Sequence, residues 1–135
     1  MILALIEHDR GIISPYSLQL LTYAHTLAES DSTVVKAVVI GQNVQALTSE
    51  LRKYSPDGII IIEDERLENF NAEAWAGSII QLAESKEPSI IIAAATDKGN
   101  EVLAHIGALL DLPMSAYTSA IQGGAEKKIT RLRWG

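Results

Sequence analysis

The sequence contains no cysteine, and this absence excludes several kinds of chemistry at once. Disulfide bonds, thiolate zinc sites, iron–sulfur clusters and thiol nucleophiles all require cysteine side chains. Histidine is scarce too: the three that occur, His8, His25 and His105, are far apart and match no metal-ligand spacing. We therefore expect no metal site in this chain. No acid–base set and no nucleophile–base pair can be named either, so we expect no catalytic residue.

Long hydrophobic runs are also missing. No apolar stretch reaches the roughly 18–20 residues that a membrane helix needs, so we expect no membrane insertion. Residues 1–6 are apolar, but they lack the basic start and the length of an export signal. These residues therefore predict a first β-strand, and the expected compartment is the cytoplasm.

Positive charge is in short supply. The chain has 11 Lys and Arg residues against 17 Asp and Glu, a net charge of -6. An acidic balance of this size disfavours nucleic acid or an anionic membrane surface as a partner. The nearest approach to a basic patch falls in an expected β-hairpin and consists of Lys127, Lys128, Arg131 and Arg133.

What the sequence does contain is the composition of one folded domain. The 135 residues are 47% hydrophobic and 21% charged, which is ordinary for a globular protein. Four short apolar runs, at 2–6, 34–40, 59–62 and 90–95, are β-branched or apolar at nearly every position. Such runs are buried on both faces, so they predict a parallel sheet with helices on each side.

Segments with helical periodicity separate these strands. We expect four helices, the first from Ser14 through at least Leu27 and the others at 43–54, 71–87 and 97–110. The first is opened by Ser14 as N-cap with Pro15 in its first turn. Asn43 is the expected cap of the second. Each helix is predicted to face the core along one side. In chain order, these sides consist of Leu20, Tyr23, Ala24 and Leu27 in the first helix; Val44, Leu47, Leu51 and Tyr54 in the second; Trp75, Ile79 and Leu82 in the third; and Val102, Ile106 and Leu109 in the fourth.

Alternation of strands and helices predicts an α/β fold, a three-layer, doubly wound and mostly parallel sheet. The carboxy-terminal part behaves differently. Residues 114–121 are expected to form a fifth strand and 122–126 a turn. Residues 127–134 alternate in polarity, which predicts a strand antiparallel to its neighbour.

Ligands of an open parallel sheet bind beyond the carboxyl ends of its strands. Of the loops at that edge, the one at 96–100 is the strongest candidate for ligand binding, because Thr96 and Asp97 lead into a helix with Gly99 in its first turn. Free N–H groups there are able to hold a phosphate or a carboxylate. Helix capping by Thr96 or Asp97, with Gly99 allowing close packing, explains the same residues and is favoured.

Two other loops carry chemistry-bearing side chains. Glu7 and His8 form an acid–histidine neighbour pair, although adjacent residues rarely point the same way, and a solvated polar loop at 7–11 is the favoured interpretation. The acidic loop at 63–68 lacks the alternate spacing of a calcium site and is interpreted as a solvated turn. The sequence contains neither a Walker A motif nor a G-x-G-x-x-G fingerprint.

Taken in order, four segments resemble the amino-terminal domain of electron-transfer flavoprotein α subunits. The first is ILALIEHDRGIISPYSLQLLTYAHTLAE, where the match is carried by Glu7, His8, Gly11, Ser14 and Pro15. The second is VVKAVVIGQN, with its glycine turn at Gly41. The third is AATDKGNEVLAHIGALLDLPMSAYTSAI, through Thr96, Gly99, Ala104, Ala108, Leu112 and Pro113. The last is ITRLRWG, through Arg131, Trp134 and Gly135.

The resemblance implies a sheet of the adenine-nucleotide α-hydrolase-like type, with residues 1–135 forming the amino-terminal domain. Members of the family are about twice as long and continue into an FAD-binding domain that this sequence lacks. The full protein would be a heterodimer with a β subunit and would carry FAD, whereas this chain alone is expected to bind no cofactor. Any cofactor contact from this domain is expected at Thr96, Gly99, Asn100 and Arg131.

Two functions follow from these observations. The resemblance implies a structural and subunit-interface domain of an electron carrier. In the complete complex, electrons would pass from dehydrogenases, such as acyl-CoA dehydrogenases, to a quinone oxidoreductase or another respiratory acceptor. The alternative is a small adenine-nucleotide-binding domain of the universal-stress type, which shares the sheet plan. That type places a glycine-rich phosphate cradle after the fourth strand, whereas here Gly99 is followed next by Gly107, deep in the helix.

Overall fold

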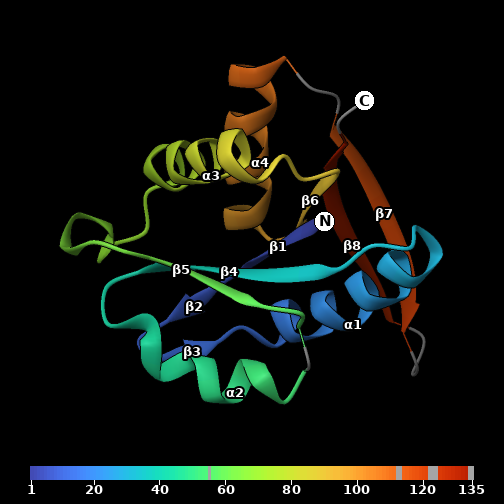
Figure 1. Ribbon diagram of the computed structural model, residues 1–135, viewed down its shortest axis with the longest axis horizontal. Coiled ribbons are helices and arrows are strands. Elements are labelled where there is room, and N and C mark those ends of the chain that lie inside the picture. Colours follow the sequence, from blue (N-terminus) through green and yellow to red (C-terminus); the bar gives the residue numbers. More distant parts are fainter. Residues whose placement is uncertain (55, 112–113, 122–124, 134–135) are drawn as a thin grey trace.

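A six-stranded sheet forms the centre of the protein in the order β5-β4-β1-β6-β8-β7 (Figure 1). The computed structural model describes the chain except for residues 55, 112–113, 122–124 and 134–135, and describes side chains only as far as residue 111. The strands of this sheet are β1 (Ile2–Ile6), β4 (Val35–Gly41), β5 (Ile59–Glu63), β6 (Ile90–Ala94), β7 (Met114–Ile121) and β8 (Ala125–Arg133).

Four of these strands, β5, β4, β1 and β6, run parallel, as the apolar runs predict. Ile2 lies opposite Val35 on one side and Ile90 on the other. Every residue of β1 and of β6 is buried. Burial on both faces explains why these strands are continuous apolar runs and do not alternate with polar residues.

Helices cover both faces of the sheet, which confirms the three-layer α/β fold (Figure 1). One face packs against α1 (Pro15–Ser30) and α2 (Thr48–Arg52), through side chains such as Leu20 and Leu51. The other face packs against α3 (Ala72–Lys86) and α4 (Asp97–Leu110), through Trp75, Ile79 and Ile106. None of the helices described is long and apolar enough to cross a membrane.

The long helices begin where the sequence predicts. Ser14 caps α1 by accepting a hydrogen bond from the Tyr16 N–H, with Pro15 in the first turn. Asn71 caps α3 through the Ala74 N–H, and Thr96 caps α4 through the Gly99 N–H. Each of these side-chain oxygens satisfies one of the amide groups that a helix leaves free at its start.

The predicted second helix differs from expectation. It divides into a 3₁₀ turn, η1 (Val44–Leu47), and the short α2. Asn43 adopts a left-handed conformation with φ 56° and makes no side-chain capping bond, so its predicted capping role is wrong. The Val44 N–H instead donates to a Glu63 carboxylate oxygen at 3.2 Å, so the cap comes from the end of the neighbouring strand β5.

Two predicted core positions are also wrong. Tyr54, at the end of the predicted second helix, is 37% exposed. Leu109 is 64% exposed, although its spacing from Val102 and Ile106 places it on the same side of α4. The buried side of α4 is centred nearer to Leu103 and Ile106, with Leu110 partly buried at the end of the helix. Leu109 lies at the margin of that buried side and therefore points outward.

The carboxy-terminal strands form an antiparallel hairpin in which β8 lies between β6 and β7. The antiparallel carboxy-terminal strand predicted from the sequence is thereby confirmed. The expected turn falls partly on residues 122–124, which lie outside the described residues, as do Leu112, Pro113, Trp134 and Gly135.

Candidate functional site

The strand order places a topological switch point between β1 and β6. The chain passes from β1 to β4 and β5 on one side, then crosses to β6 on the other side of β1. In open α/β sheets, ligands bind in the crevice that such a reversal leaves at the carboxyl ends of the strands. Glu7 follows β1 directly, and Thr96 follows β6 by two residues, so these two residues stand at the crevice.

A hydrogen bond joins these two residues. The Thr96 hydroxyl donates to Oε1 of Glu7 at 2.5 Å, and the same Thr96 oxygen accepts the Gly99 N–H at 3.0 Å. Glu7 is only 7% exposed, so its carboxylate is nearly enclosed by the protein. A negatively charged group of the chain itself thus lies, through Thr96, at the amino-terminal end of α4, where a helix attracts anions.

Gly99 is required at its position by the closeness of the strand. A Cβ atom added there would lie 2.1 Å from the Ala94 carbonyl oxygen. The helix therefore begins in direct contact with the end of β6, as the packing interpretation of Gly99 proposed. Capping and close packing explain Thr96 and Gly99 within the chain itself.

The structure brings together three of the four predicted cofactor-binding residues. Thr96, Gly99 and Asn100 share one turn, in which the Asn100 N–H donates to the Thr96 carbonyl at 2.9 Å, and Asn100 is exposed. The fourth, Arg131, lies on β8 with its backbone paired to Ile92 of β6. Its side chain is outside the part of the chain described.

The solvated loop predicted at 7–11 is wrong for its first two residues. Glu7 is buried, and His8 is partly buried, with Nε2 2.6 Å from the Ile40 carbonyl oxygen. A carbonyl only accepts, so Nε2 carries the hydrogen. The His8 ring also stacks on Trp75 with centroids 6.0 Å apart. Glu7 and His8 thus bond to different parts of the fold and are not arranged as an acid–base pair.

Sequence reasoning missed Ser17, which completes the surroundings of Glu7. Ser17 is fully buried in the first turn of α1, and its hydroxyl accepts the Glu7 N–H at 2.8 Å. The Ser14 N–H donates to the Glu7 carbonyl at 2.9 Å. The signal in the sequence is that Ser17 lies one turn before Leu20 and Leu21, on the side of α1 that faces the sheet.

The acidic loop at 63–68 contains the 3₁₀ turn η2 (Glu65–Leu67) and an ion pair. Arg66 donates from Nε and from a terminal nitrogen to the two carboxylate oxygens of Asp64, at 3.0 and 2.8 Å. These side-chain bonds, with one from the Arg66 main-chain N–H, lower the pKa of Asp64 to about 2. Within the residues described, no group of acidic or histidine side chains is arranged to hold a metal ion.

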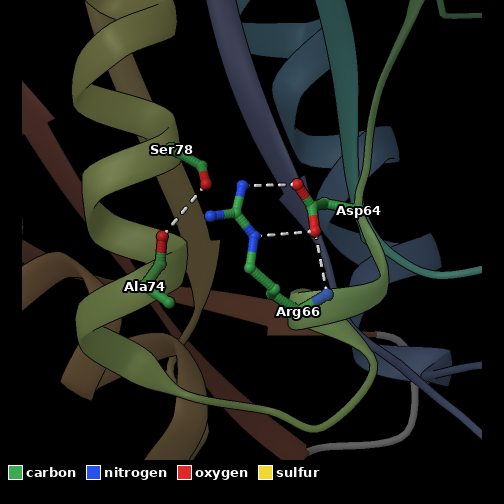
Figure 2. A network of polar contacts seen from close by, with 4 residues as sticks. All are labelled: Asp64, Arg66, Ala74 and Ser78. Carbon is green, nitrogen blue, oxygen red and sulfur yellow. Dashed lines mark hydrogen bonds and ion pairs between the residues drawn. The ribbon is translucent and has the colours of Figure 1, made fainter.

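An open hollow of about 560 Å³ lies beside this loop, between the carboxyl end of β5 and α3. Ile62 of β5 and Leu67 of η2 line it on one side, and Ala74, Gly77, Ser78 and Gln81 line it from α3. Figure 2 shows the Arg66 guanidinium between Asp64 and the α3 residues Ala74 and Ser78. The hollow is thus an open depression whose helical wall has three small residues beside Gln81.

Comparison with known proteins identifies relatives over nearly the whole chain. Residues 2–135 match the family described as electron transfer flavoprotein domain. The electron transfer flavoprotein subunit alpha of Thermoanaerobacterium thermosaccharolyticum is 28% identical over 110 residues, which are 82% of this chain and 33% of that protein. The subunit of the same name from Syntrophomonas wolfei is 24% identical over 92% of this chain and 38% of its own length.

A third relative has a different name. It is the lactate dehydrogenase (NAD(+),ferredoxin) subunit LctC of Acetobacterium woodii, 24% identical over 95% of this chain and 31% of its own length. The chain thus spans about a third of the length of the curated relatives it matches, so these relatives are longer than the twofold length that the resemblance implied. Together these matches confirm the resemblance to the amino-terminal domain of α subunits that the sequence motifs carry.

Proposed function

Because the chain belongs to the electron transfer flavoprotein domain family, we propose that residues 1–135 act as the amino-terminal structural and subunit-interface domain of an α subunit. The domain contributes no catalytic residue and is part of an electron carrier, not an enzyme. The complete complex carries FAD, pairs with a β subunit, and passes electrons from dehydrogenases to a respiratory acceptor in the cytoplasm or at a membrane quinone oxidoreductase.

The observation that supports this proposal is the contact between Glu7 and Thr96. The residues at the switch point do not suit a nucleotide phosphate, because the nearly buried Glu7 carboxylate is already held at the start of α4. A second negative group in that place would be repelled. We therefore propose that the flavin is held by parts of the complete protein outside this chain, and that Thr96, Gly99 and Asn100 contact it at most from the edge.

The alternative, an adenine-nucleotide-binding domain of the universal-stress type, depends on the same crevice. Such a domain needs free main-chain N–H groups after β6 to cradle phosphates. Here the Gly99 N–H bonds to the Thr96 hydroxyl, and that hydroxyl bonds to Glu7. This arrangement favours the electron-carrier proposal over nucleotide binding.

The electron donor is open to two proposals. Acyl-CoA dehydrogenases are the donors that the resemblance first implies. The relative in Acetobacterium woodii is named as a subunit of a lactate dehydrogenase that uses NAD(+) and ferredoxin. We therefore propose that the donor is a dehydrogenase of small organic acids or of their thioesters, bound through the complete complex and not through this domain alone.

The test is to purify the chain alone, record its visible spectrum, and titrate it with AMP, ATP and FAD by calorimetry. A colourless protein without measurable affinity for these three ligands is expected. Co-expression of an α subunit that contains this domain with its β subunit should then yield a yellow complex. Tight binding of AMP or ATP by the isolated chain would instead establish the nucleotide-binding alternative.

A further inference from the structure

One edge of the sheet is open. In the part of the chain that the structure describes, β5 pairs with β4 and with no other strand, so the main-chain groups on its outer side face away from the sheet. The residues from Ile59 to Ile62 are all partly exposed. Edge strands are usually protected by lysine, proline, a bulge or a covering segment. The segment from Ile59 to Ile62 consists of four isoleucines and so contains neither lysine nor proline.

The hollow described above lies directly beside this edge. Ile62 and Leu67 contribute apolar side chains to its lining, and α3 contributes the small residues Ala74, Gly77 and Ser78 together with Gln81. A strand added next to β5 would direct alternate side chains to the α3 side of the sheet. The hollow lies where one of these side chains of the added strand would pack.

Gly77 gives independent support for a close approach at this wall. Glycine in the interior of a helix costs about 1 kcal/mol relative to alanine. Gly77 is exposed, and a Cβ atom added there would meet nothing within 4 Å, so no contact within the described chain requires glycine. A glycine at such a position suits the approach of a backbone from outside.

The charges around the hollow define the partner. Glu63 lines the hollow and is exposed, with one carboxylate oxygen accepting the Val44 N–H, and the adjoining acidic loop adds the exposed Glu65 and Glu68. The positive charge of Arg66 is already paired with Asp64. A segment that approaches this edge therefore meets a net negative field, which favours lysine or arginine.

We propose that β5 and the hollow bind an extended, cationic segment of a partner polypeptide, which joins the sheet as an additional strand. Main-chain hydrogen bonds to β5 supply affinity, and an apolar side chain in the hollow with a cation facing the acidic loop supplies selectivity. This surface is separate from the switch point, and the proposal does not depend on the electron-carrier function.

The test uses a fluorescein-labelled decapeptide of alternating valine and lysine as the probe, followed by fluorescence anisotropy with the purified chain. Its control has the same charge, but two of its valines are replaced by proline, which cannot donate main-chain hydrogen bonds to a strand. Saturable binding of the first peptide, at least tenfold tighter than that of the proline peptide, is expected. Equal binding of the two peptides would overturn the proposal, because it shows charge attraction alone.

Two variants locate the site. Gly77→Gln adds a side chain to the α3 wall of the hollow, at a position where the new Cβ atom meets nothing within 4 Å, and should weaken binding of the valine–lysine peptide at least tenfold. Ser85→Gln makes a matched change at an exposed position of α3 that does not line the hollow, and should leave binding unchanged. Equal affinity of both variants would overturn the proposal. So would dimerisation of the wild-type chain in sedimentation that Gly77→Gln abolishes, since a second copy would then be the occupant.

Discussion

The hydroxyl of Thr96 donates a 2.5 Å hydrogen bond to the carboxylate of Glu7 and so joins the ends of β6 and β1 across 89 positions of sequence. The same oxygen caps α4 by accepting the Gly99 N–H. A single side chain therefore connects two strands and a helix at the point where related folds bind ligands. The crevice of the sheet is used here to hold the domain together.

Replacing Thr96 by valine should destabilise the protein by about 2–4 kcal/mol, because it removes a helix cap and leaves a buried carboxylate without this donor. The free energy of unfolding in urea measures the effect. Thr96→Ser keeps the oxygen and should remain within about 1 kcal/mol of the wild type. A Thr96→Val variant as stable as Thr96→Ser would show that the hydrogen bond to Glu7 contributes nothing.

Two glycine-to-alanine substitutions should have opposite effects. Gly99→Ala places a methyl group 2.1 Å from the Ala94 carbonyl oxygen, so α4 must move away from β6. A loss of about 1–3 kcal/mol, or more, is expected from this overpacking. Gly77→Ala meets nothing within 4 Å and should stabilise α3 by up to about 1 kcal/mol.

Thermal unfolding followed by circular dichroism compares the two variants directly. The transition temperature should fall for Gly99→Ala and rise for Gly77→Ala. A similar small change in both variants would contradict the close contact between α4 and β6, because helix propensity alone favours alanine at both positions.

The architecture can be predicted well from the sequence, because buried strands have a recognisable pattern of apolar residues. β1, with all five residues buried, is a continuous apolar run with the predicted bounds. α4 likewise has the predicted bounds, Asp97–Leu110, because Thr96 has the residue type that caps helices. The bounds of these two elements depend on residues that are close together in the sequence, so they can be predicted from the sequence alone.

Contacts between distant segments are what sequence reasoning missed. Glu7 and His8 look like solvated loop residues, yet one bonds to Thr96 and the other to the Ile40 carbonyl, 32 residues away. The Val44 N–H is capped by Glu63 of another strand, and the neighbouring Asn43 does not cap it. Nothing local indicates such pairings, because they arise only once the parallel strands bring their carboxyl ends together.

Gly41 and His8 should be energetically coupled. Gly41 has φ +151°, and an added Cβ atom would lie 3.0 Å from Val44 Cγ1 and 3.1 Å from His8 Cε1. Gly41→Ala should therefore destabilise the protein by about 1–3 kcal/mol through strain and crowding.

A double-mutant cycle separates the two causes. In a His8→Ala background part of the crowding is removed, so Gly41→Ala should cost at least about 0.5 kcal/mol less than in the wild type. Chemical denaturation of the four proteins gives the coupling energy. Strict additivity would show that His8 does not restrict the space at Gly41 and that backbone strain accounts for the whole effect.

The ion pair of Asp64 and Arg66 should be visible in the titration of a single carboxyl group. Hydrogen bonds from the Arg66 side chain, then from its main-chain N–H, lower the pKa of Asp64 from 3.8 to about 2. Because the folded-state pKa is lowered, the pair stabilises the fold above about pH 4, where the unfolded chain is also ionised. This contribution is lost as the pH falls toward 2. It is small, because the pair is exposed to solvent.

Carbon-13 NMR of the aspartate carboxyl groups between pH 2 and 5 measures this pKa. At pH 3 the Asp64 carboxyl should be about nine-tenths ionised, against about one-seventh for a group with a pKa of 3.8. Arg66→Gln should move the midpoint back toward 3.8, whereas Arg52→Gln, at an exposed position of α2, should not. An unchanged midpoint in Arg66→Gln would mean that the guanidinium does not hold the carboxylate in solution.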